Sequence, residues 1–331
     1  MNFEVNWTSS GLDPRAVAQR WLAEGRAAIV IEVTHARGSV PREAGTRMLV
    51  GTGVGVGVGV GMGGESSVGT IGGGHLELQA IASARALLAR FTAAADPLAQ
   101  LVSQPVAPSE HFALGPALGQ CCGGAVTLRY DVLDAATLAR WPVATALFHL
   151  QLYGAGHVGR AIAALLTTLD VSVDWIDERE SEFPATTRFG TPWPAHIRQV
   201  CVDAVDAEVR LAPAGAFYLV LTHDHDLDLR ITEAVLRRAD FGYLGLIGSQ
   251  TKRQRFVHRF EARGIDAATI ARLTCPIGAA GAPVKDADWR KQPEVIAVGV
   301  VAQLLQERLQ QRLYLRVLQP GESDRAAPRD P

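Results

Sequence analysis

The chain has 331 residues, of which 48% are hydrophobic and 20% are charged, and its formal net charge is -2. This composition is that of a globular protein, and the length suits about two domains. The near-neutral charge argues against a general nucleic-acid-binding protein, which would carry a basic patch or a high pI.

The sequence shows no export or membrane signal: no basic segment and apolar core follow Met1, and no apolar run approaches the roughly 18 residues that a membrane span requires. The four cysteines, Cys121, Cys122, Cys201 and Cys275, are too few and too unevenly spaced for a disulfide framework or a tetrahedral zinc site. We therefore expect a cytoplasmic protein with reduced thiols that binds neither nucleic acid nor membranes.

The chain begins with alternating helical and strand patterns. Asp13 as N-cap and Pro14 at the first helical position predict a helix that ends near Gly25. An apolar strand from Ala27 to Thr34 leads into a polar loop, residues 35–45, that is rich in glycine and cationic side chains.

From Gly51 to Gly64, valine alternates with glycine. The alternation imitates a strand, but a strand that is half glycine has high unfolded-state entropy and few side chains to pack. We interpret this tract as a flexible expansion of a hairpin loop.

Three glycines, Gly72, Gly73 and Gly74, separate a predicted strand from a helix that begins at His75 and runs to about Arg90. Backbone N–H groups exposed at such a helix start form a physical anion site. The same glycines are equally compatible with a tight strand-to-helix turn that binds nothing.

A segment with four prolines, Asp96 to Pro116, is predicted to be a loop. Gly119-Gln120-Cys121-Cys122-Gly123-Gly124 follows it and precedes a strand, Ala125 to Leu133. Buried cysteine commonly acts as a small hydrophobe. The neighbouring glycines and Gln120 favour an accessible turn, in which Cys121 or Cys122 could react or bind a ligand.

A domain boundary is expected near Trp141-Pro142, and a Rossmann βαβ signature follows it. The signature consists of a buried strand, the segment Gly154-Ala155-Gly156-His157-Val158-Gly159, an apolar helix and a second strand that ends before Asp177. Gly154 permits a tight turn, Gly156 lets N–H groups approach a pyrophosphate, and Gly159 lets the helix pack closely. The fold alone leaves open whether the crevice binds a nucleotide.

A later strand ends in Thr222-His223-Asp224-His225-Asp226, which points toward the crevice of an α/β sheet. His223 and His225, with Asp226, could hold a metal, although no further carboxylate partner is evident. Polar packing, or helix capping by Asp224 or Asp226, explains the same residues equally well.

Lys252 and Arg253 stand at another helix start, where the helix dipole disfavours cations. They either extend into solvent, which we expect, or bind an anionic ligand. A closing helix begins at Pro293. The complete prediction is an α/β protein with a smaller α+β domain, residues 1–140, a Rossmann-like doubly wound parallel sheet, residues 146–316, and a disordered tail, 317–331.

Six of these motifs, in this order, resemble the XdhC/CoxI family. The resemblance extends from Ala27 to about Leu305, and the glycine–valine tract is longer than the family leads us to expect. The motifs occupy Thr34–Gly45, Gly69–Glu77, Gln120–Gly124, Gly154–Val158, Thr222–Asp226 and Pro276–Gly278.

The resemblance implies a chaperone for the molybdenum cofactor, Mo-molybdopterin, rather than a catalyst. Such proteins bind the cofactor, assist the replacement of a terminal oxo ligand by sulfido with sulfur from a cysteine desulfurase, and deliver the product to xanthine dehydrogenase. A molybdenum insertase is a further expected partner. The family's Cys-Gly-Gly maps onto Cys122-Gly123-Gly124, which makes Cys122 the expected thiol near molybdenum and Cys121 an auxiliary one.

The chemistry of this cofactor is compatible with the residues of the motifs. Its phosphate needs helix-start N–H groups or a guanidinium such as Arg42 or Arg37. Its soft metal centre suits a cysteine thiolate. The predicted cofactor-binding residues are Ser39, Arg42, Gly72, Gly73, Gly74, His75, Glu77 and Cys122, with Gly154, Gly156, Gly159 and Asp177 for a possible nucleotide.

Two other hypotheses use the second domain alone. An NAD(P)-dependent oxidoreductase would use the glycine-rich crevice with His223 or His225 as proton donor. That hypothesis assigns no role to the first domain. A scaffold protein would use the Rossmann-like domain only for dimerisation and would bind no ligand in either domain. Whatever the function, we expect a homodimer because it is the commonest soluble oligomer.

Overall fold

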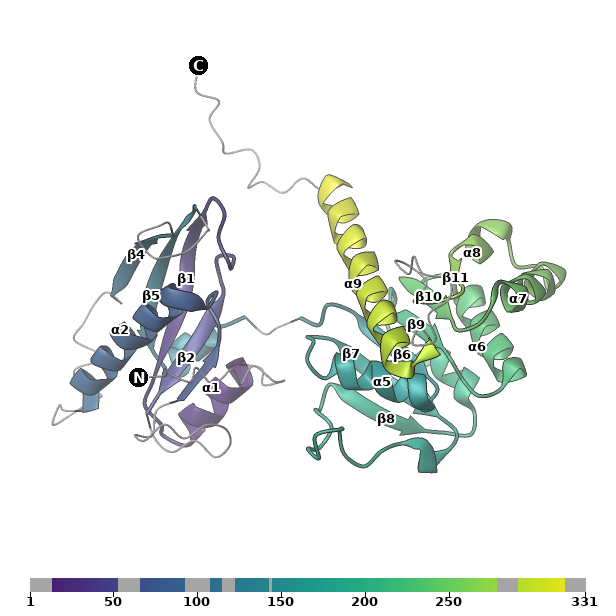
Figure 1. Cartoon of the computed structure of the whole chain (residues 1–331), viewed down its shortest axis with the longest axis horizontal. Coiled ribbons are helices and arrows are strands. Elements are labelled where there is room, and N and C mark those ends of the chain that lie inside the picture. Colours follow the sequence, from purple (N-terminus) through teal and green to yellow (C-terminus); the bar gives the residue numbers. More distant parts are fainter. Residues whose placement is uncertain are drawn as a thin grey trace, which may run out of the picture. The chain divides into compact units, whose positions relative to one another are not determined.

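The computed structural model describes residues 14–52, 66–92, 108–114, 123–142, 145–278 and 291–318. The chain divides into two compact units, Met1–Val143 and Ala144–Pro331. Figure 1 shows the elements of both units. The glycine–valine tract from residue 53 on, Cys121 and Cys122, and the predicted tail from residue 319 on lie outside the described residues.

The first unit is an antiparallel sheet with the strand order β3-β2-β1-β5-β4. Its strands are β1 (Ala28–Arg37), β2 (Arg47–Gly51), β3 (Ser66–Gly69), β4 (Ser109–Ala113) and β5 (Ala125–Val132). Its helices are α1 (Pro14–Ala23), α2 (Gly74–Thr92) and α4 (Ala135–Ala139). The segment Asp96–Pro116 was predicted as a loop, and this prediction is wrong for β4, whose start after Pro108 suits an edge strand.

Strand β1 is apolar on both faces because helices cover both of them. Ile29, Ile31 and Val33 belong to the hydrophobic cluster that contains α2, whereas Ala28 and Val30 belong to the cluster that contains α1. Beyond Val33 the ladder with β5 shifts its register. From this point on, the α1 side of the sheet carries polar side chains.

The second unit is a parallel sheet with the order β11-β10-β9-β6-β7-β8. Numbered in chain order from β6, this is the 3-2-1-4-5-6 order of the Rossmann fold. The strands are β6 (His149–Tyr153), β7 (Ser172–Asp177), β8 (Ile197–Cys201), β9 (Phe217–Val220), β10 (Tyr243–Leu246) and β11 (Leu273–Thr274). The predicted fold class, a Rossmann-like sheet preceded by a smaller α+β region, is confirmed.

Helices cover both faces of the parallel sheet and enclose two hydrophobic clusters. The helices are α5 (His157–Leu166), α6 (His225–Arg238), α7 (Gln250–Ala262), α8 (Ala267–Ala271) and α9 (Pro293–Leu318), with 3₁₀ turns η2 (Glu180–Glu182) and η3 (Val205–Leu211). One cluster contains residues of α5 and α9, and the other contains residues of α6 and α7. The strand order reverses between β6 and β9, so a crevice for a ligand is expected at their carboxyl ends.

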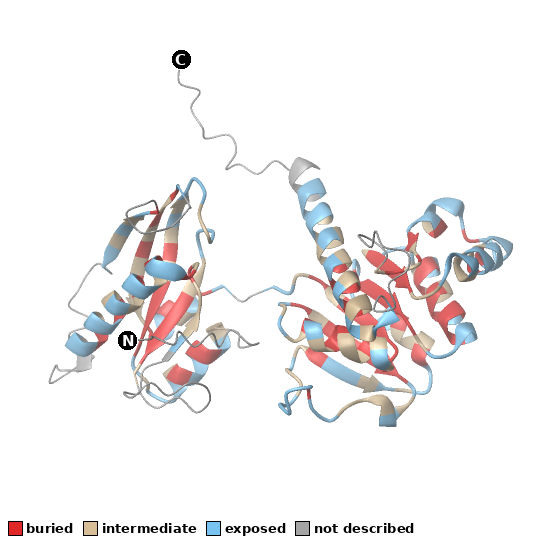
Figure 2. Cartoon of the chain, in the orientation of Figure 1, coloured by how far each residue is buried: buried red, intermediate tan, exposed pale blue. Residues whose placement is uncertain are grey.

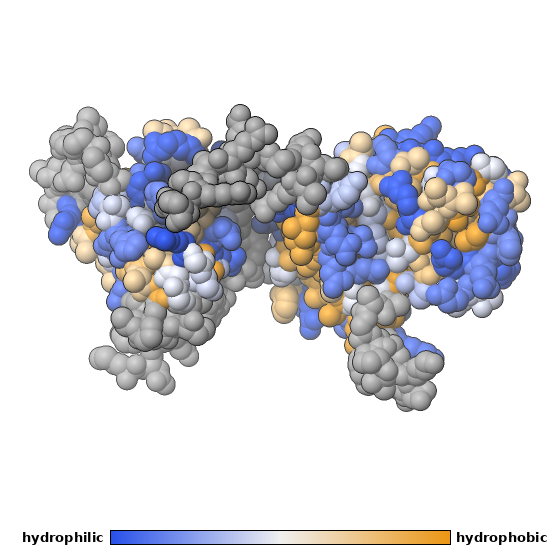
Figure 3. Space-filling view, turned by 90° about the horizontal axis from the view of Figure 1, so that it is seen from above, coloured by the Kyte–Doolittle hydropathy of each residue, from blue (hydrophilic) through white to orange (hydrophobic). Residues whose placement is uncertain are grey.

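Buried residues concentrate in the strands and on the helix sides that face them (Figure 2). On the face that Figure 3 shows, the described residues of the second unit include both hydrophilic surface and hydrophobic patches. Exposed hydrophobic side chains on α9 include Val298, Leu309 and Leu313. None of the helices in the described part of the chain is long and apolar enough to cross a membrane.

Candidate functional site

Three sequence motifs of the first unit meet at one end of its sheet. A Cβ atom on Gly124 would overlap the backbone oxygens of Arg37 and Ser39, and one on Gly72 would overlap the ring of Pro41. The loop after β1 therefore packs against both the start of β5 and the glycine turn before α2. Only glycine at positions 124 and 72 permits this close approach.

The glycine turn before α2 already binds a carboxylate of the chain itself. Glu77 Oε2 accepts hydrogen bonds from Thr70 Oγ1 at 2.6 Å, from the Gly73 N–H at 2.9 Å and from the Ile71 N–H at 3.2 Å. The Gly72 N–H donates to Thr70 Oγ1 at 3.1 Å. Donors that the sequence offered for a phosphate are thus used internally, which favours the tight-turn interpretation.

The other predicted residues of this region lie at the surface. Ser39, Arg42 and His75 are exposed, and the Arg42 side chain lies beside Gly72, since a Cβ on that glycine would be 3.8 Å from Arg42 Cγ. Gly124 is buried. The structure therefore brings Ser39 to the place where the Cys-Gly-Gly motif ends, and Arg42 to the glycine turn before α2.

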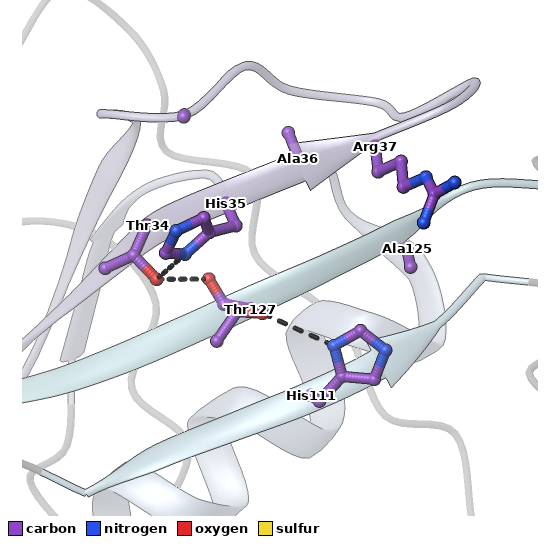
Figure 4. Close-up of a pocket in the computed structure, with 8 residues that line it drawn as sticks. Thr34, His35, Ala36, Arg37, His111, Ala125 and Thr127 are labelled. Atoms are coloured by element: carbon purple, nitrogen blue, oxygen red, sulfur yellow. Dashed lines mark hydrogen bonds between the residues drawn. The ribbon is translucent and has the colours of Figure 1, made fainter. Parts of the chain in front are cut away.

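Beside these loops, a pocket of about 610 Å³ lies on the polar face of the sheet (Figure 4). Five of the residues that line it belong to the predicted motif Thr34–Gly45, but the sequence led us to propose only Arg37 as a ligand. The lining comprises Thr34, His35, Ala36, Arg37, Ala44, His111, Ala125 and Thr127. The sequence feature that indicates this pocket is the row of polar side chains on one face of β1, β4 and β5. It can be recognised only when β4 is known to be a strand.

The strand register arranges this lining as a trough along β5. Thr127 is the registered partner of His35 on β1 and of His111 on β4. One step further along, Ala125 is the partner of Arg37 on β1. The small side chains of β5 form the floor, and the larger side chains of the two neighbouring strands form the walls.

Hydrogen bonds orient both imidazoles at the trough. Thr34 Oγ1 donates to the Thr127 carbonyl at 3.1 Å and lies 3.3 Å from His35 Nδ1. His111 Nδ1 lies 3.3 Å from Thr127 Oγ1 (Figure 4). Because the Thr34 hydroxyl has one proton, His35 Nδ1 must donate to it. Nε2 of His35 then carries a lone pair when the ring is neutral.

An ion-pair network closes one end of the trough. Arg129 Nη2 lies 2.6 Å from Glu32 Oε2, and Arg129 Nε lies 2.8 Å from Asp131 Oδ2. The hydrogen bond with Asp131 raises the pKa of Arg129. Arg47 adds a third contact, with Nη2 2.9 Å from Glu32 Oε1. The other end of the trough, at Arg37 and Ala125, leads to Gly124.

The second unit positions its glycine-rich loop as the sequence predicts. A Cβ on Gly154 would overlap the Leu221 carbonyl, and one on Gly159 would overlap the Gly154 carbonyl. Gly156 is the N-cap of α5, has no side-chain cap, and has open space where a Cβ would stand. The tight-turn and close-packing roles of Gly154 and Gly159 are confirmed, and the Gly156 geometry is compatible with a ligand.

Asp177 does not offer a free carboxylate to that crevice. Its oxygens accept four hydrogen bonds, from the Ala155 N–H at 2.7 Å, from the Arg179 N–H at 3.0 Å, and from Arg179 Nε and Nη2 at 2.9 Å each. Burial acts to raise the pKa of Asp177, but the bonds from Arg179 and Ala155 outweigh it and lower the pKa. Asp177 therefore fastens the glycine-rich loop to the end of β7.

The histidine cluster after β9 acts in helix capping. Asp224 Oδ1 accepts from the N–H groups of Asp226 at 2.7 Å and Leu227 at 2.8 Å, so the capping alternative is confirmed. His223 Nε2 lies 3.6 Å from Glu178 Oε1, and His225 is exposed. In the part of the chain that the structure describes, no three His, Cys, Asp or Glu residues are placed to hold a metal ion.

Lys252 does not extend into solvent, so the expectation from the sequence is wrong for this residue. Its Nζ lies 2.5 Å from Asp228 Oδ2 and donates to the Ile247 carbonyl at 2.9 Å. Its side chain is 11% exposed and that of Asp228 1%. The unfavourable dipole of α7 is offset by a carboxylate that belongs to another helix, α6.

Comparisons with known proteins match both units. The family model of the XdhC Rossmann domain matches residues 150–304, and that of the XdhC and CoxI family matches residues 21–94. Over 286 residues the chain is 30% identical to the uncharacterized protein YqeB of Escherichia coli strain K12. This match covers 83% of the chain and 42% of YqeB, so the chain spans less than half of that relative.

A solved structure has the same fold. It is the crystal structure of a Bacillus halodurans protein described as a xanthine dehydrogenase, with a TM-score of 0.63 and 16% sequence identity. The alignment covers 89% of this chain and 96% of that one. At this identity the similarity shows that the two chains share their architecture.

Proposed function

Because this chain belongs to the XdhC and CoxI family, we propose that it is a molybdenum-cofactor chaperone in the maturation of xanthine dehydrogenase. The cofactor is cargo that the protein receives from a molybdenum insertase, holds and releases. A cysteine desulfurase supplies the sulfur that replaces a terminal oxo ligand, and xanthine dehydrogenase accepts the product. The setting is the cytoplasm, and the protein acts as a homodimer.

One observation carries this proposal: three motifs that are far apart in the sequence meet at one end of the first sheet. The loop with Ser39 and Arg42 contacts Gly124 and Gly72 through backbone approaches that only glycine permits. Such convergence of small and polar groups at a surface suits a ligand site. The candidate thiol, Cys122, stands two residues before Gly124 in the sequence.

The proposal assigns Cys122 to molybdenum, because a thiolate is a suitable ligand for a soft metal centre. A single thiolate contact also permits release of the cargo. We expect Cys122→Ala to weaken cofactor binding by about tenfold or more, the effect of losing about 1.4 kcal/mol or more of binding free energy. Titration of the purified protein with released molybdenum cofactor, followed by absorbance, measures this change.

Cys201→Ala is the matched control, since Cys201 is an exposed free cysteine of the second unit. It should bind the cofactor as the wild type does, and circular dichroism should show that both variants are folded. Unchanged affinity of Cys122→Ala would remove this thiol from the site. If the wild-type protein binds no cofactor, the chaperone proposal fails.

The oxidoreductase alternative is less well supported. In dinucleotide-binding Rossmann folds the acid after the second strand accepts a ribose hydroxyl. Here both oxygens of Asp177 already accept bonds from Arg179 and Ala155. A nucleotide in this crevice would contact the α5 start, where Gly156 leaves open space. A parallel titration with NAD tests this alternative, and we expect no saturable binding.

A further inference from the structure

The trough along β5 is lined by His35, Arg37, His111, Ala125 and Thr127. We propose that it seats the pterin ring and the phosphate of the cofactor; this inference rests on the proposed function and names the surface that performs it. The shape of the trough, its charge and its open end each suit this ligand.

The shape suits a flat ring. Adjacent strands are about 4.8 Å apart, so His35 and His111, one strand to either side of Thr127, are separated by roughly 10 Å between their Cα atoms. The floor between them consists of the small side chains of Ala125 and Thr127. This floor is therefore where a planar ring would lie, with the imidazoles at its edges.

The charge of the lining suits an anion. Arg37 is exposed, and no acidic residue is among the residues that line the trough in the described part of the chain. Glu32 and Asp131, which lie further along the same sheet, are already paired with Arg129. A guanidinium binds phosphate through two parallel N–H···O bonds, which a lysine cannot do.

The imidazoles offer hydrogen bonds to the ring. His35 Nδ1 donates to Thr34 Oγ1, so Nε2 is left to accept from a ligand N–H when the ring is neutral. Pterins present ring N–H and amino groups along their pyrimidine edge. His111 Nδ1 lies 3.3 Å from Thr127 Oγ1, which also orients this ring. Figure 4 shows both rings beside Thr127.

The two ends of the trough differ, and this difference sets the orientation of the ligand. The ion pairs of Arg129 close one end, and Arg37 and Ala125 mark the end that leads to Gly124. In molybdopterin the phosphate and the metal-binding dithiolene stand at the same end of the ring system. A phosphate on Arg37 therefore directs the dithiolene toward Gly124, where the Cys-Gly-Gly motif ends.

Two substitutions test the site by independent routes. Arg37→Met removes the phosphate ligand, and we expect roughly tenfold or greater weakening of cofactor binding, the effect of losing a hydrogen bond to a charged group. Ala125→Phe fills the floor and should abolish binding by steric exclusion. For the dephosphorylated cofactor, we expect Arg37→Met to bind as the wild type does and Ala125→Phe still to fail.

Arg188→Met is the matched control for Arg37→Met, and His258→Gln is a general surface control; both change exposed side chains of the second unit. Both should bind the cofactor as the wild type does, and circular dichroism should show that every variant is folded. If wild type binds the cofactor and folded Arg37→Met and Ala125→Phe bind it equally well, the trough is not the site, while the chaperone proposal stands. If wild type does not bind, both proposals are overturned.

Discussion

The ion pair of Lys252 and Asp228 lies where α6 and α7 begin, and it joins these two helices. Asp228 Oδ1 also accepts from the Thr222 N–H at 3.0 Å and from Thr222 Oγ1 at 2.7 Å. One carboxylate thus holds the end of β9 and the start of α7. In the folded protein both charged groups have hydrogen-bonding partners. Because both side chains are largely removed from water, each charge is stabilised mainly by the other.

Breaking this pair should be costly. Asp228→Asn leaves the Lys252 ammonium buried without a counter-charge, and Lys252→Met leaves the carboxylate in the same position, so each should lower the free energy of unfolding by about 3–5 kcal/mol. The double variant should be more stable than the sum of the single losses predicts. Urea unfolding followed by circular dichroism measures all four proteins. Strict additivity would show that the two charges do not stabilise each other.

At the scale of elements, the glycine turn and the start of α2 form one unit held by Glu77. Its carboxylate stands where a bound anion would stand, because it accepts from Thr70 and from two backbone N–H groups. Glu77→Ala should therefore destabilise the turn by about 1.5–3 kcal/mol, the range for hydrogen bonds to a charged group. The same change should expose these donors to solvent.

Phosphate binding to these exposed donors gives a second, more specific measurement of the same change. Phosphate should raise the melting temperature of Glu77→Ala more than that of the wild type, because an added anion can occupy the vacated position. Sodium chloride at equal ionic strength is the control for general salt effects. An equal response of both proteins to phosphate would show that the turn is not an anion site even without Glu77.

The elements show which features the sequence reveals and which it hides. The Rossmann-like unit was predictable because its signature is local: Gly154, Gly159 and Asp177 lie within one βαβ unit. The trough was not, because it needs the register that aligns His35 with Thr127 and His111, residues far apart in the chain. Because β4 was predicted as a loop, the wall of the trough that contains His111 was not predicted.

The roles of single polar residues were also only partly predictable. Glu77 was expected to bind cofactor, and the structure shows it bonded to the turn that was expected to bind the phosphate. Lys252 was assigned to solvent because its counter-charge, Asp228, comes from another helix. A sequence shows which groups can form hydrogen bonds, whereas the choice among partners depends on tertiary packing.

At the scale of the whole molecule, α9 carries a second apolar stripe besides the one packed in its own unit. Ala297, Val300, Val301 and Leu304 are buried in the cluster shared with α5. Figure 1 shows the C-terminal part of α9 projecting away from the sheet. The second stripe repeats at the alternating spacing of 4 and 3 residues that is typical of helix pairing, and it consists of exposed Val298, Ala302 and Leu309 with half-buried Leu305, which also packs against the cluster shared with α5.

This stripe is self-complementary in an antiparallel pair of α9 helices. Pairing Val298 with Leu309 of a second copy also places Ala302 against Leu305, so that small and large side chains alternate. The same register brings Glu294 beside Arg312 of the second copy, which adds an opposite-charge contact at each end. Both charged residues are exposed in the single chain. Shape and charge together favour a second copy as the partner of this surface.

We therefore predict a homodimer through α9. Leu309→Glu should shift the protein to a monomer, because it places a carboxylate in an apolar contact, whereas Leu211→Glu, at a 69% exposed leucine on η3, should not. Glu294→Arg and Arg312→Glu should each weaken the dimer, and the double variant should restore it because the charge pair is re-formed with opposite sense. Sedimentation equilibrium measures the dissociation constants. A wild-type monomer at all concentrations, or a dimer indifferent to Leu309→Glu, would exclude this interface.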